Sequence, residues 1–398
     1  MSKFANSHKL QEILIDRIKR SPRGQITFAE YMALALYHQQ YGYYSSGIVK
    51  IGAEGDFFTA ASLGKDFGEL LAVQFLQMWH NLDCPNPFYL VEMGAGNGQL
   101  AKDILSFLQN SGDRKAEPTA SRDLVEALRY IIVEESPALI ETQQQLLQSL
   151  NLNLTWQTWS EIASDSIVGC FFSNELVDAF PVHLIEKDRD RLCEVYLSLE
   201  DGELSETLDV LSTENIVKYF EAIGIDLLEK QYPQGYRTEV NLQAKKWLKT
   251  VASKLDRGYV LTIDYGYSAD KYYRPSRDRG TLQCYYQHRR HNNPYANLGY
   301  QDITARVNFT ALERQGELCN LTTLGFTQQG LFLMALGLGD RLNELSSGKY
   351  NITEIFQRRD ALHQLIDPTG LGGFGVLIQG KNLSSTRSLQ GLTTPAML

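Results

Sequence analysis

Apolar positions in the first 85 residues recur at the spacing of helices. The helix expected at residues 8–20 has one apolar face made of Leu10, Ile13, Leu14 and Ile18. Thr27 and Glu30 form a capping-box pattern that predicts the start of a second helix over residues 27–40. A third helix is expected around 65–80. We therefore predict that residues 1–85 form a mostly helical N-terminal extension.

Beyond residue 86, short apolar runs alternate with helical patterns. The runs that predict strands lie at residues 88–93, 130–135, 152–156, 166–173, 258–267 and 373–381. Helices are expected between them at 100–108 and 138–150. The run at 166–173 is almost uniformly apolar, as in a strand that is buried on both faces. This alternation predicts an α/β domain over residues 86–381, with a mostly parallel sheet and helices on both faces.

Several segments do not fit the alternation and are expected to be linkers or insertions. We predict a polar linker at 110–123 and a β-insertion at about 182–235, which begins with a hairpin and turns acidic and irregular after residue 200. A helical insertion is predicted at about 330–365 and a flexible tail at 382–398.

Composition narrows the class of protein. The chain has 398 residues, of which 43% are hydrophobic, and a formal net charge of −9. This is enough apolar material for a full core, and the acidic balance argues against a protein that mainly binds nucleic acid. No apolar run is long enough for a transmembrane helix. The five cysteines form no CxxC pair, so we expect neither a disulfide framework nor a cysteine zinc site, and we expect a reduced, cytoplasmic protein.

A glycine-rich segment follows the first predicted strand. Gly94, Gly96 and Gly98 lie at a strand-to-helix junction, where glycines permit a tight turn and close approach of a ligand to the backbone. Gln99 stands where a dinucleotide site has its third glycine, which weakens an NAD interpretation. No GK[ST] follows, so the segment is not a P-loop. A glycine-rich turn without a ligand is the alternative.

Acidic residues at the next strand end favour an adenosine ligand. Glu134, with Glu135 beside it, lies at the carboxyl end of the strand at 130–135, where a carboxylate can bind both hydroxyls of a ribose. Glu92 enters the glycine turn, where it would repel a diphosphate but suit the ammonium of an amino acid. An adenosine joined to an amino-acid tail describes S-adenosyl-L-methionine. A solvated strand end is the alternative for Glu134.

A third group of polar residues follows the strand at 166–173. Asn174, Glu175 and Asp178 lie at its carboxyl edge, and Glu175 and Asp178 are spaced to share one face of a helical turn. Paired carboxylates suit a guanidinium, which offers a planar fork of donors. Acids in the first turn of a helix are the alternative, because they favour its macrodipole.

Two further segments have weaker signals. Asp56, in the glycine-flanked sequence GDFFT, can approach a ligand closely, or it can cap a packed turn. The segment 271–291 is rich in arginine in an acidic chain, so we expect it to face a partner, with a solvated loop as the alternative. Its HRRH sequence lacks convincing ligand spacing, and no metal is expected.

Seven motifs together resemble the MidA family. In chain order they are GDFFT, FGELLA, VEMGAGNGQLAKDIL, VEESPALIETQQ, FFSNELVDAFPV, IDYGY and DITARVNF. The resemblance runs from about residue 25 to 380 and implies a class I S-adenosylmethionine-dependent methyltransferase with a Rossmann-like fold. By position it implies that Gly94, Gly96 and Gly98 line the cofactor and that Glu134 binds the ribose. Asn174, Glu175 and Asp178 would then flank the site of methyl transfer.

The resemblance also implies an acceptor. Its best understood member is a protein arginine methyltransferase that acts on a subunit of respiratory complex I, so a protein subunit of a NADH dehydrogenase-like complex is the expected partner. Methylation of a small molecule or a nucleic acid is one alternative, the latter disfavoured by the acidic pI of about 5.4. An assembly factor that binds the cofactor without catalysis is the other.

Overall fold

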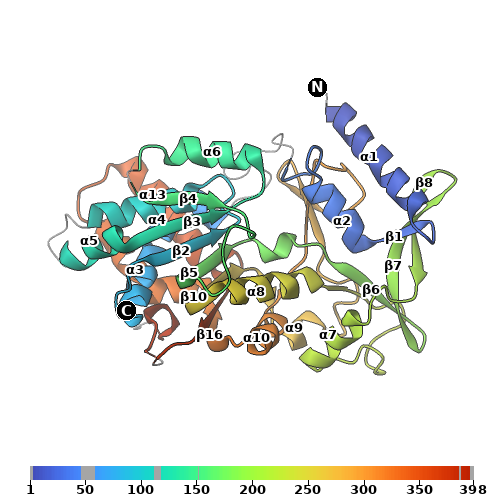
Figure 1. The fold of residues 1–398 in the computed structure, drawn as a ribbon. Helices are drawn as coiled ribbons and strands as arrows, with labels where there is room; N and C mark the ends of the chain where they lie inside the picture. Colours follow the sequence, from blue (N-terminus) through green and yellow to red (C-terminus); the bar gives the residue numbers. More distant parts are fainter. Residues whose placement is uncertain (1–2, 46–58, 112–117, 151, 385–386, 395–398) are drawn as a thin grey trace.

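The larger of two lobes is built on a seven-stranded sheet. The computed structural model describes residues 3–45, 59–111, 118–150, 152–384 and 387–394. In spatial order the sheet contains β16 (Thr322–Gln328), β17 (Gly375–Lys381), β10 (Leu255–Asp264), β5 (Ile167–Asn174), β2 (Phe88–Met93), β3 (Leu128–Val133) and β4 (Leu154–Gln157) (Figure 1). All six predicted strands are present in it, and β16 is an edge strand that the sequence pattern did not reveal.

The direction of the strands confirms a mostly parallel sheet. β10, β5, β2, β3 and β4 pair in parallel, whereas β17 runs antiparallel to both of its neighbours. β2 pairs with β3 on one side and β5 on the other, so the strand order reverses at β2. Ligands of open α/β sheets bind at the carboxyl ends of the strands at such a point.

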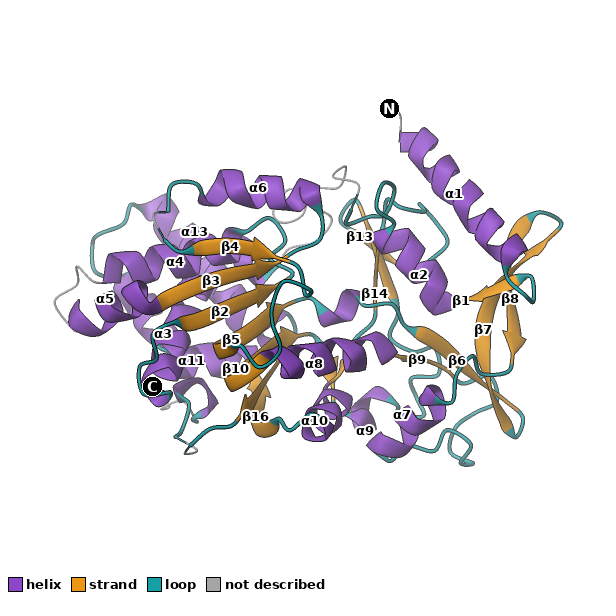
Figure 2. Cartoon of the chain, in the orientation of Figure 1, coloured by secondary structure: helices purple, strands orange, loops and turns teal. Residues whose placement is uncertain are grey.

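Helices cover both faces of this sheet (Figure 2). One face packs against α3 (Asp66–Asn81), α4 (Gln99–Ser111), α6 (Pro137–Leu147) and α11 (Gln329–Ala335). The other packs against α8 (Leu242–Lys254) and α10 (Phe309–Leu318), with Leu248 and Val251 fully buried. The predicted polar linker at 110–123 is wrong in its second half. That part begins α5 (Pro118–Ala127), which is anchored by buried Leu124 and Ala127.

The smaller lobe joins the N-terminus to the β-insertion. Its five-stranded sheet contains β1 (Gln25–Thr27), β7 (Arg191–Glu200), β6 (His183–Asp188) and β9 (Arg237–Val240), with β8 (Glu203–Asp209) paired to β7. The predicted hairpin is the β6–β7 pair. The stretch after residue 200 is not irregular, because it contains β8 and α7 (Asn215–Ile223).

The first 85 residues are divided between the two lobes. α1 (Lys3–Arg20) and α2 (Phe28–Tyr37) pack with the smaller lobe, where β1 pairs with β7. α3 instead belongs to the larger lobe. The predicted capping box is confirmed, since the Thr27 amide donates to Glu30 Oε2 and the Glu30 amide donates to Thr27 Oγ1, both at 3.1 Å.

Short strands connect the lobes between residues 266 and 308. β11 (Gly266–Tyr267) pairs with β15 (Val307–Asn308), and β12 (Gln283–Tyr286) lies between β13 (Arg289–His291) and β14 (Asp302–Thr304). A solvated loop was the alternative for the segment that contains HRRH. The structure instead places HRRH at the turn and second strand of the β12–β13 hairpin. The backbone reverses there because Gln287 and His288 have φ of 50° and 60°.

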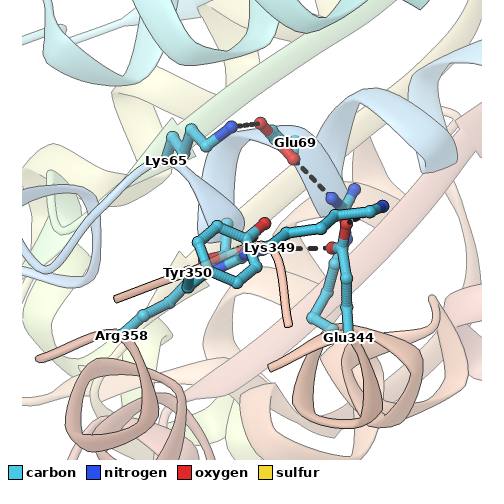
Figure 3. A network of polar contacts seen from close by, with 8 residues as sticks. Lys65, Glu69, Glu344, Lys349, Tyr350 and Arg358 are labelled. Carbon is cyan, nitrogen blue, oxygen red and sulfur yellow. Dashed lines mark hydrogen bonds and ion pairs between the residues drawn. The ribbon is translucent and has the colours of Figure 1, made fainter. Parts of the chain in front are cut away.

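Ion pairs hold the late helices to α3. The helical insertion contains α11, α12 (Leu338–Glu344) and α13 (Ile352–Ile366), as predicted for 330–365. Arg358 of α13 pairs with Asp66, and Arg341 of α12 pairs with Glu69, each at 2.6 Å. Figure 3 shows Arg358 and Glu69 within this network of polar contacts. The four side chains of the two pairs are no more than 15% exposed. Breaking such a buried pair by removing one partner is costly, so the insertion is firmly attached to the larger lobe.

The C-terminal segment is packed where the structure describes it, contrary to the predicted flexible tail. Leu389 is buried, and the amide of Gly391 donates to Gln74 Oε1 of α3 at 2.9 Å. The packing arises because the segment covers apolar surface on α3 and α11. In the described ranges, no helix combines the length and apolar character needed to cross a bilayer.

Candidate functional site

Two cavities open at the carboxyl edge of the large sheet, and Glu175 lines both. The first cavity has a volume of about 190 Å³ and lies at the point where the strand order reverses. Six of the predicted site residues line it: Glu92, Gly94, Gly96, Glu134, Asn174 and Glu175. The tertiary structure therefore brings the ends of three strands, distant in sequence, around one space.

The glycine turn forms one wall of the first cavity. Gly94, Gly96 and Gly98 have φ of 72°, 55° and 86°, a region that side chains other than glycine rarely adopt. A Cβ at Gly94 would also lie 2.7 Å from the side chain of Leu176. Gly98 does not line the cavity. It lies against Gln143, whose side chain would be 3.2 Å from a Cβ added at Gly98. The glycine therefore lets the turn pack closely on α6.

Glu134 is fixed at the end of β3. Its Oε1 accepts hydrogen bonds from the backbone amides of Glu135 and Ser136, both at 2.9 Å. Its Oε2 accepts a bond from Gln143 at 3.3 Å. Burial raises the pKa of Glu134, although these three donors oppose that shift. Glu135 is exposed and does not line the first cavity, so Glu134 is the acid that can bind a ribose there.

Glu92 lies beneath the glycine turn and is only 3% exposed. The hydroxyl of Tyr130 donates to its Oε2 at 2.7 Å. Burial raises the pKa of Glu92 to about 7, against the opposing effect of the Tyr130 hydrogen bond. A cationic ligand group beside it would favour the ionised carboxylate, which fits the ammonium of an amino-acid tail.

Two tyrosines from the smaller lobe close the first cavity, and sequence reasoning missed them. Tyr37 and Tyr44 stack with ring centroids 5.5 Å apart, and both line the cavity. The Tyr37 hydroxyl donates to the carbonyl of Ala179, while the Tyr44 hydroxyl donates to Asp302 Oδ1 at 2.8 Å. Tyr37 ends α2 and Tyr44 follows it closely, but no local pattern indicates that they meet Ala179 and Asp302.

Glu175 lies between the two cavities in an unusual backbone conformation. Its φ is 51°, a strained value for a non-glycine residue and one that often marks functional sites. Its Oε1 accepts bonds from the Ala60 amide and from Asn174 Nδ2, both at 3.3 Å. Burial, assisted by the charge of Asp178, raises the pKa of Glu175 to about 8.

The expectation that Glu175 and Asp178 share a helical face is wrong. The positive φ of Glu175 turns its side chain away before the single 3₁₀ turn at Val177–Ala179 begins. Asp178 lines neither cavity. Its Oδ2 instead accepts a short hydrogen bond from the Tyr265 hydroxyl.

Asp264, at the end of β10, holds this turn in place. It is fully buried, and its Oδ2 accepts bonds from the amides of Val177 and Asp178 at 2.9 and 3.3 Å. Burial and the charges of Asp178 and Glu175 raise the pKa of Asp264 well above its ordinary value. The sequence analysis assigned Asp264 no role, although it is the acid of the IDYGY motif.

The second cavity begins at Glu175 and has a volume of about 570 Å³. Aromatic side chains from several elements line it, among them Tyr265, Tyr267, Tyr285 and Phe374. Asp302 and Arg306 also contribute to its wall. The cavity therefore combines aromatic and polar walls, and the Glu175 carboxylate lies where it meets the first cavity.

The predictions for Asp56 and for the basic segment 271–291 both stay predictions. Asp56 lies outside the described residues, so its predicted ligand contact remains a prediction. In the basic segment 271–291, Arg289 and Arg290 are exposed on β13. Within the part of the chain that the structure describes, no group of three metal-ligating side chains occurs.

The first cavity fits the cofactor that the family resemblance implies. The glycine turn leaves room for close approach of a ligand, Glu134 is placed for a ribose, and Glu92 is placed for an ammonium. Asn174 Oδ1 is buried without a hydrogen-bond partner among the described residues. An unpaired buried oxygen is costly, so a donor group of a bound ligand would relieve it.

Comparisons with known proteins agree with this geometry. Residues 70–327 match the Methyltransf_28 family of S-adenosyl-L-methionine-dependent methyltransferases. The chain is 28% identical over 381 residues to the Drosophila melanogaster protein arginine methyltransferase NDUFAF7 homolog, covering 89% of this chain and 81% of the relative. It is 26% identical to human NDUFAF7 over 364 residues, covering 88% and 78%.

A solved structure is similar over almost the whole chain. It is a COG1565 superfamily member from Burkholderia thailandensis, crystallised with S-adenosyl-homocysteine. The identity is 30% and the TM-score 0.84, with 98% of this chain and 95% of that chain covered. The predicted class I methyltransferase fold and its cofactor, S-adenosyl-L-methionine, are thereby confirmed. This chain belongs to the MidA family of S-adenosyl-L-methionine-dependent methyltransferases.

Proposed function

We propose that this methyltransferase acts on the guanidinium of an arginine in a protein. The observation that carries the proposal is the position of Glu175, which lines the cofactor-binding first cavity and the aromatic second cavity. An arginine side chain is long and apolar along its stem and carries a planar charged tip. It matches a cavity with aromatic walls and a carboxylate where the two cavities meet.

Charge balance explains why a carboxylate is needed there. When bound, S-adenosyl-L-methionine supplies an electrophilic methyl group on its sulfonium. A guanidinium nitrogen forms the new N–C bond as the S–C bond breaks, and one proton must leave the nitrogen. Glu175 can hold the guanidinium by hydrogen bonds and take up that proton, because its pKa of about 8 is close to neutral pH.

The residues around Glu175 keep it in position. Asn174 Nδ2 and the Ala60 amide donate to its carboxylate, and Asp264 fixes the turn that follows it. We propose that Asp178 acts with Tyr265 behind this turn and tunes Glu175 through its charge. Alignment of one nitrogen with the methyl group then dominates the rate.

The names of the curated relatives support arginine as the acceptor. The Drosophila and human relatives are both named as protein arginine methyltransferases. We propose, from the family resemblance, that the partner is a subunit of a NADH dehydrogenase-like complex. A cytoplasmic location stays a prediction from the cysteine pattern alone.

A labelling experiment tests this function. The purified protein is incubated with methyl-labelled cofactor and a cell lysate, with and without added respiratory-complex subunits. Mass spectrometry then locates the labelled residue, and the Glu175→Gln protein serves as the matched control. We expect methylarginine in one protein band with the wild type and a loss with the variant. Label on a small molecule or on another residue type would contradict the proposal. Equal partner assembly by wild type and variant, without label, would favour an assembly factor.

A further inference from the structure

Three cations gather at the wall of the second cavity. Lys271 and Arg306 line the cavity, and Arg277 lies against its tyrosine wall. The guanidinium carbons of Arg277 and Arg306 lie 4.3 and 5.0 Å from the ring centroid of Tyr267. Arg306 also lies 5.6 Å from the centroid of Tyr265. Cation–π contacts with two rings hold the Arg306 fork in a defined orientation.

None of the three cations forms an ion pair within the described ranges, although the buried acid Asp302 lies in the same cavity wall. Arg277 donates to the backbone carbonyls of Lys271 and Tyr272. Asp270, the acid on the same short helix, is not part of the cavity wall. Burial, together with the charges of Arg274 and Arg306, lowers the pKa of Arg277. Like charges held this close and partly buried would be stabilised by an anion between them.

The wall of the second cavity therefore carries charges of both signs. Glu175 lies where the cavity meets the first one, and the buried carboxyl groups of Asp178 and Asp264 lie behind it. Exposed Lys271 and half-buried Arg306 lie on the cavity wall, together with the buried acid Asp302. A ligand with a single positive charge matches only the carboxylates. A ligand with a cationic tip and a nearby anionic group matches both the carboxylates and the cations.

We propose that the second cavity selects acceptor segments in which an acidic side chain lies close to the methylated arginine. This inference rests on the proposed function, because it takes arginine as the acceptor. The guanidinium reaches Glu175, while the acidic side chain pairs with Arg306 and Lys271. Arg306 is then a specificity-determining residue, and the sequence analysis gave it no role although it is the arginine of the DITARVNF motif.

Short peptides test the selection without the natural acceptor. Each peptide has a glycine–serine background and a central arginine, with Glu or Gln at one flanking position. A second set replaces the arginine by citrulline, its neutral counterpart. Binding is measured by fluorescence anisotropy on protein loaded with S-adenosyl-homocysteine, at low and high salt. We expect the best Glu peptide to bind about tenfold more tightly than its Gln counterpart, with a difference that shrinks in high salt.

Variants assign the preference to the cation cluster. Arg306→Gln should reduce the Glu-over-Gln preference to about twofold or less, and Lys271→Gln should reduce it partly. Arg314→Gln is the matched control, because this exposed arginine of α10 pairs with Glu317 outside the cavity. It should keep the full preference. Affinity for S-adenosyl-homocysteine, measured in parallel, reports whether each variant is folded.

The outcomes separate this inference from the proposed function. A wild-type protein that binds Glu and Gln peptides equally overturns the selection, and this comparison requires no variant. Preserved preference in Arg306→Gln overturns the assignment to Arg306. If arginine and citrulline peptides bind equally, the proposed arginine acceptor is wrong, whether or not the Glu preference is seen. If arginine is methylated without any flanking preference, the proposed function stands and the inference fails.

Discussion

The side-chain amide of Gln143 joins the ribose-facing acid Glu134 to the glycine turn. Its nitrogen lies 3.3 Å from Glu134 Oε2 and 2.8 Å from the carbonyl oxygen of Gly96, so it donates to both. Its oxygen accepts a bond from Trp156 Nε1 at 2.8 Å, which fixes the orientation of the amide. Two predicted features, the glycine turn after β2 and Glu134 after β3, are thus held together with Trp156 of β4 by one fully buried side chain.

Replacing Gln143 should weaken cofactor binding, although Gln143 itself does not line the first cavity. Gln143→Leu keeps the size of the side chain and removes both donated hydrogen bonds. We therefore expect S-adenosyl-homocysteine to bind more weakly by about 0.5–1.5 kcal/mol, the net value of a typical hydrogen bond. Calorimetry measures this, and a thermal unfolding scan reports any general loss of stability. Unchanged affinity in a folded variant would show that Glu134 is positioned by its backbone donors alone.

Glu134 itself should contribute more. Glu134→Ala is expected to weaken S-adenosyl-L-methionine binding by about 1–3 kcal/mol, as for hydrogen bonds to charged groups. Glu135→Ala is the matched control, since the neighbouring acid is exposed and should have little effect. NAD should not bind either protein measurably, because the turn lacks the third glycine. Tighter binding of NAD than of S-adenosyl-L-methionine would refute the ligand assignment.

The carboxylates after β5 should affect methyl transfer more than cofactor binding. We expect Glu175→Gln to reduce the rate by roughly 10²-fold or more, the scale for losing one preorganised electrostatic group, with little change in cofactor affinity. Asp178→Asn should reduce it less, because Asp178 lines neither cavity. The two losses should not add if the residues act as a unit. A normal rate in Glu175→Gln would rule out the guanidinium-binding role.

The raised pKa of Glu175 predicts opposite pH trends in activity and stability. The ionised form is needed to bind a guanidinium, so single-turnover rates should rise as pH increases through about 8. The folded state holds the proton more tightly than the unfolded chain, whose pKa is near 4.5. The stabilisation that comes from protonated Glu175 is therefore fully present below about pH 4.5 and is lost as the pH rises towards 8.

Glu175→Gln isolates that contribution. Denaturant unfolding of wild type and variant, compared across this pH window, should show a wild-type loss of stability that the variant lacks. Parallel pH profiles in the two proteins would mean that Glu175 does not titrate there. The charge of Asp178 contributes to the raised pKa of Glu175, and the charge of Glu175 contributes to that of Asp264, so the difference between the two proteins reports Glu175 together with its coupling to these acids.

The basic hairpin should act on partner association. Arg289 and Arg290 are exposed on β13, and neither lines the two cavities. Reversing both charges should slow association with the acceptor protein in a salt-dependent way, while S-adenosyl-homocysteine affinity stays the same. Stopped-flow association at two salt concentrations measures the effect. Loss of cofactor binding in the double variant would contradict a purely partner-facing role.

Local patterns along the chain were sufficient to predict the strands whose ends carry the cofactor site. The apolar runs before Gly94, Glu134 and Asn174 predict buried strands, and parallel strands must place their carboxyl ends at one edge. Local signals were sufficient there because each residue's position depends on its own strand. The capping box at Thr27 was predictable for the same reason, since all its atoms lie within four residues.

Which side chains line the cavities depends on contacts between segments that are remote in sequence. Glu175 leaves the helical conformation because its amide bonds to Ile263 of β10 and its carboxylate bonds to Ala60, both remote in sequence. This places Asp178 against Tyr265 rather than beside Glu175. Tyr44 closes the first cavity through Asp302, which lies 258 residues away. Such contacts depend on how two lobes pack, and the packing free energy is spread over the whole interface, so no local pattern encodes it.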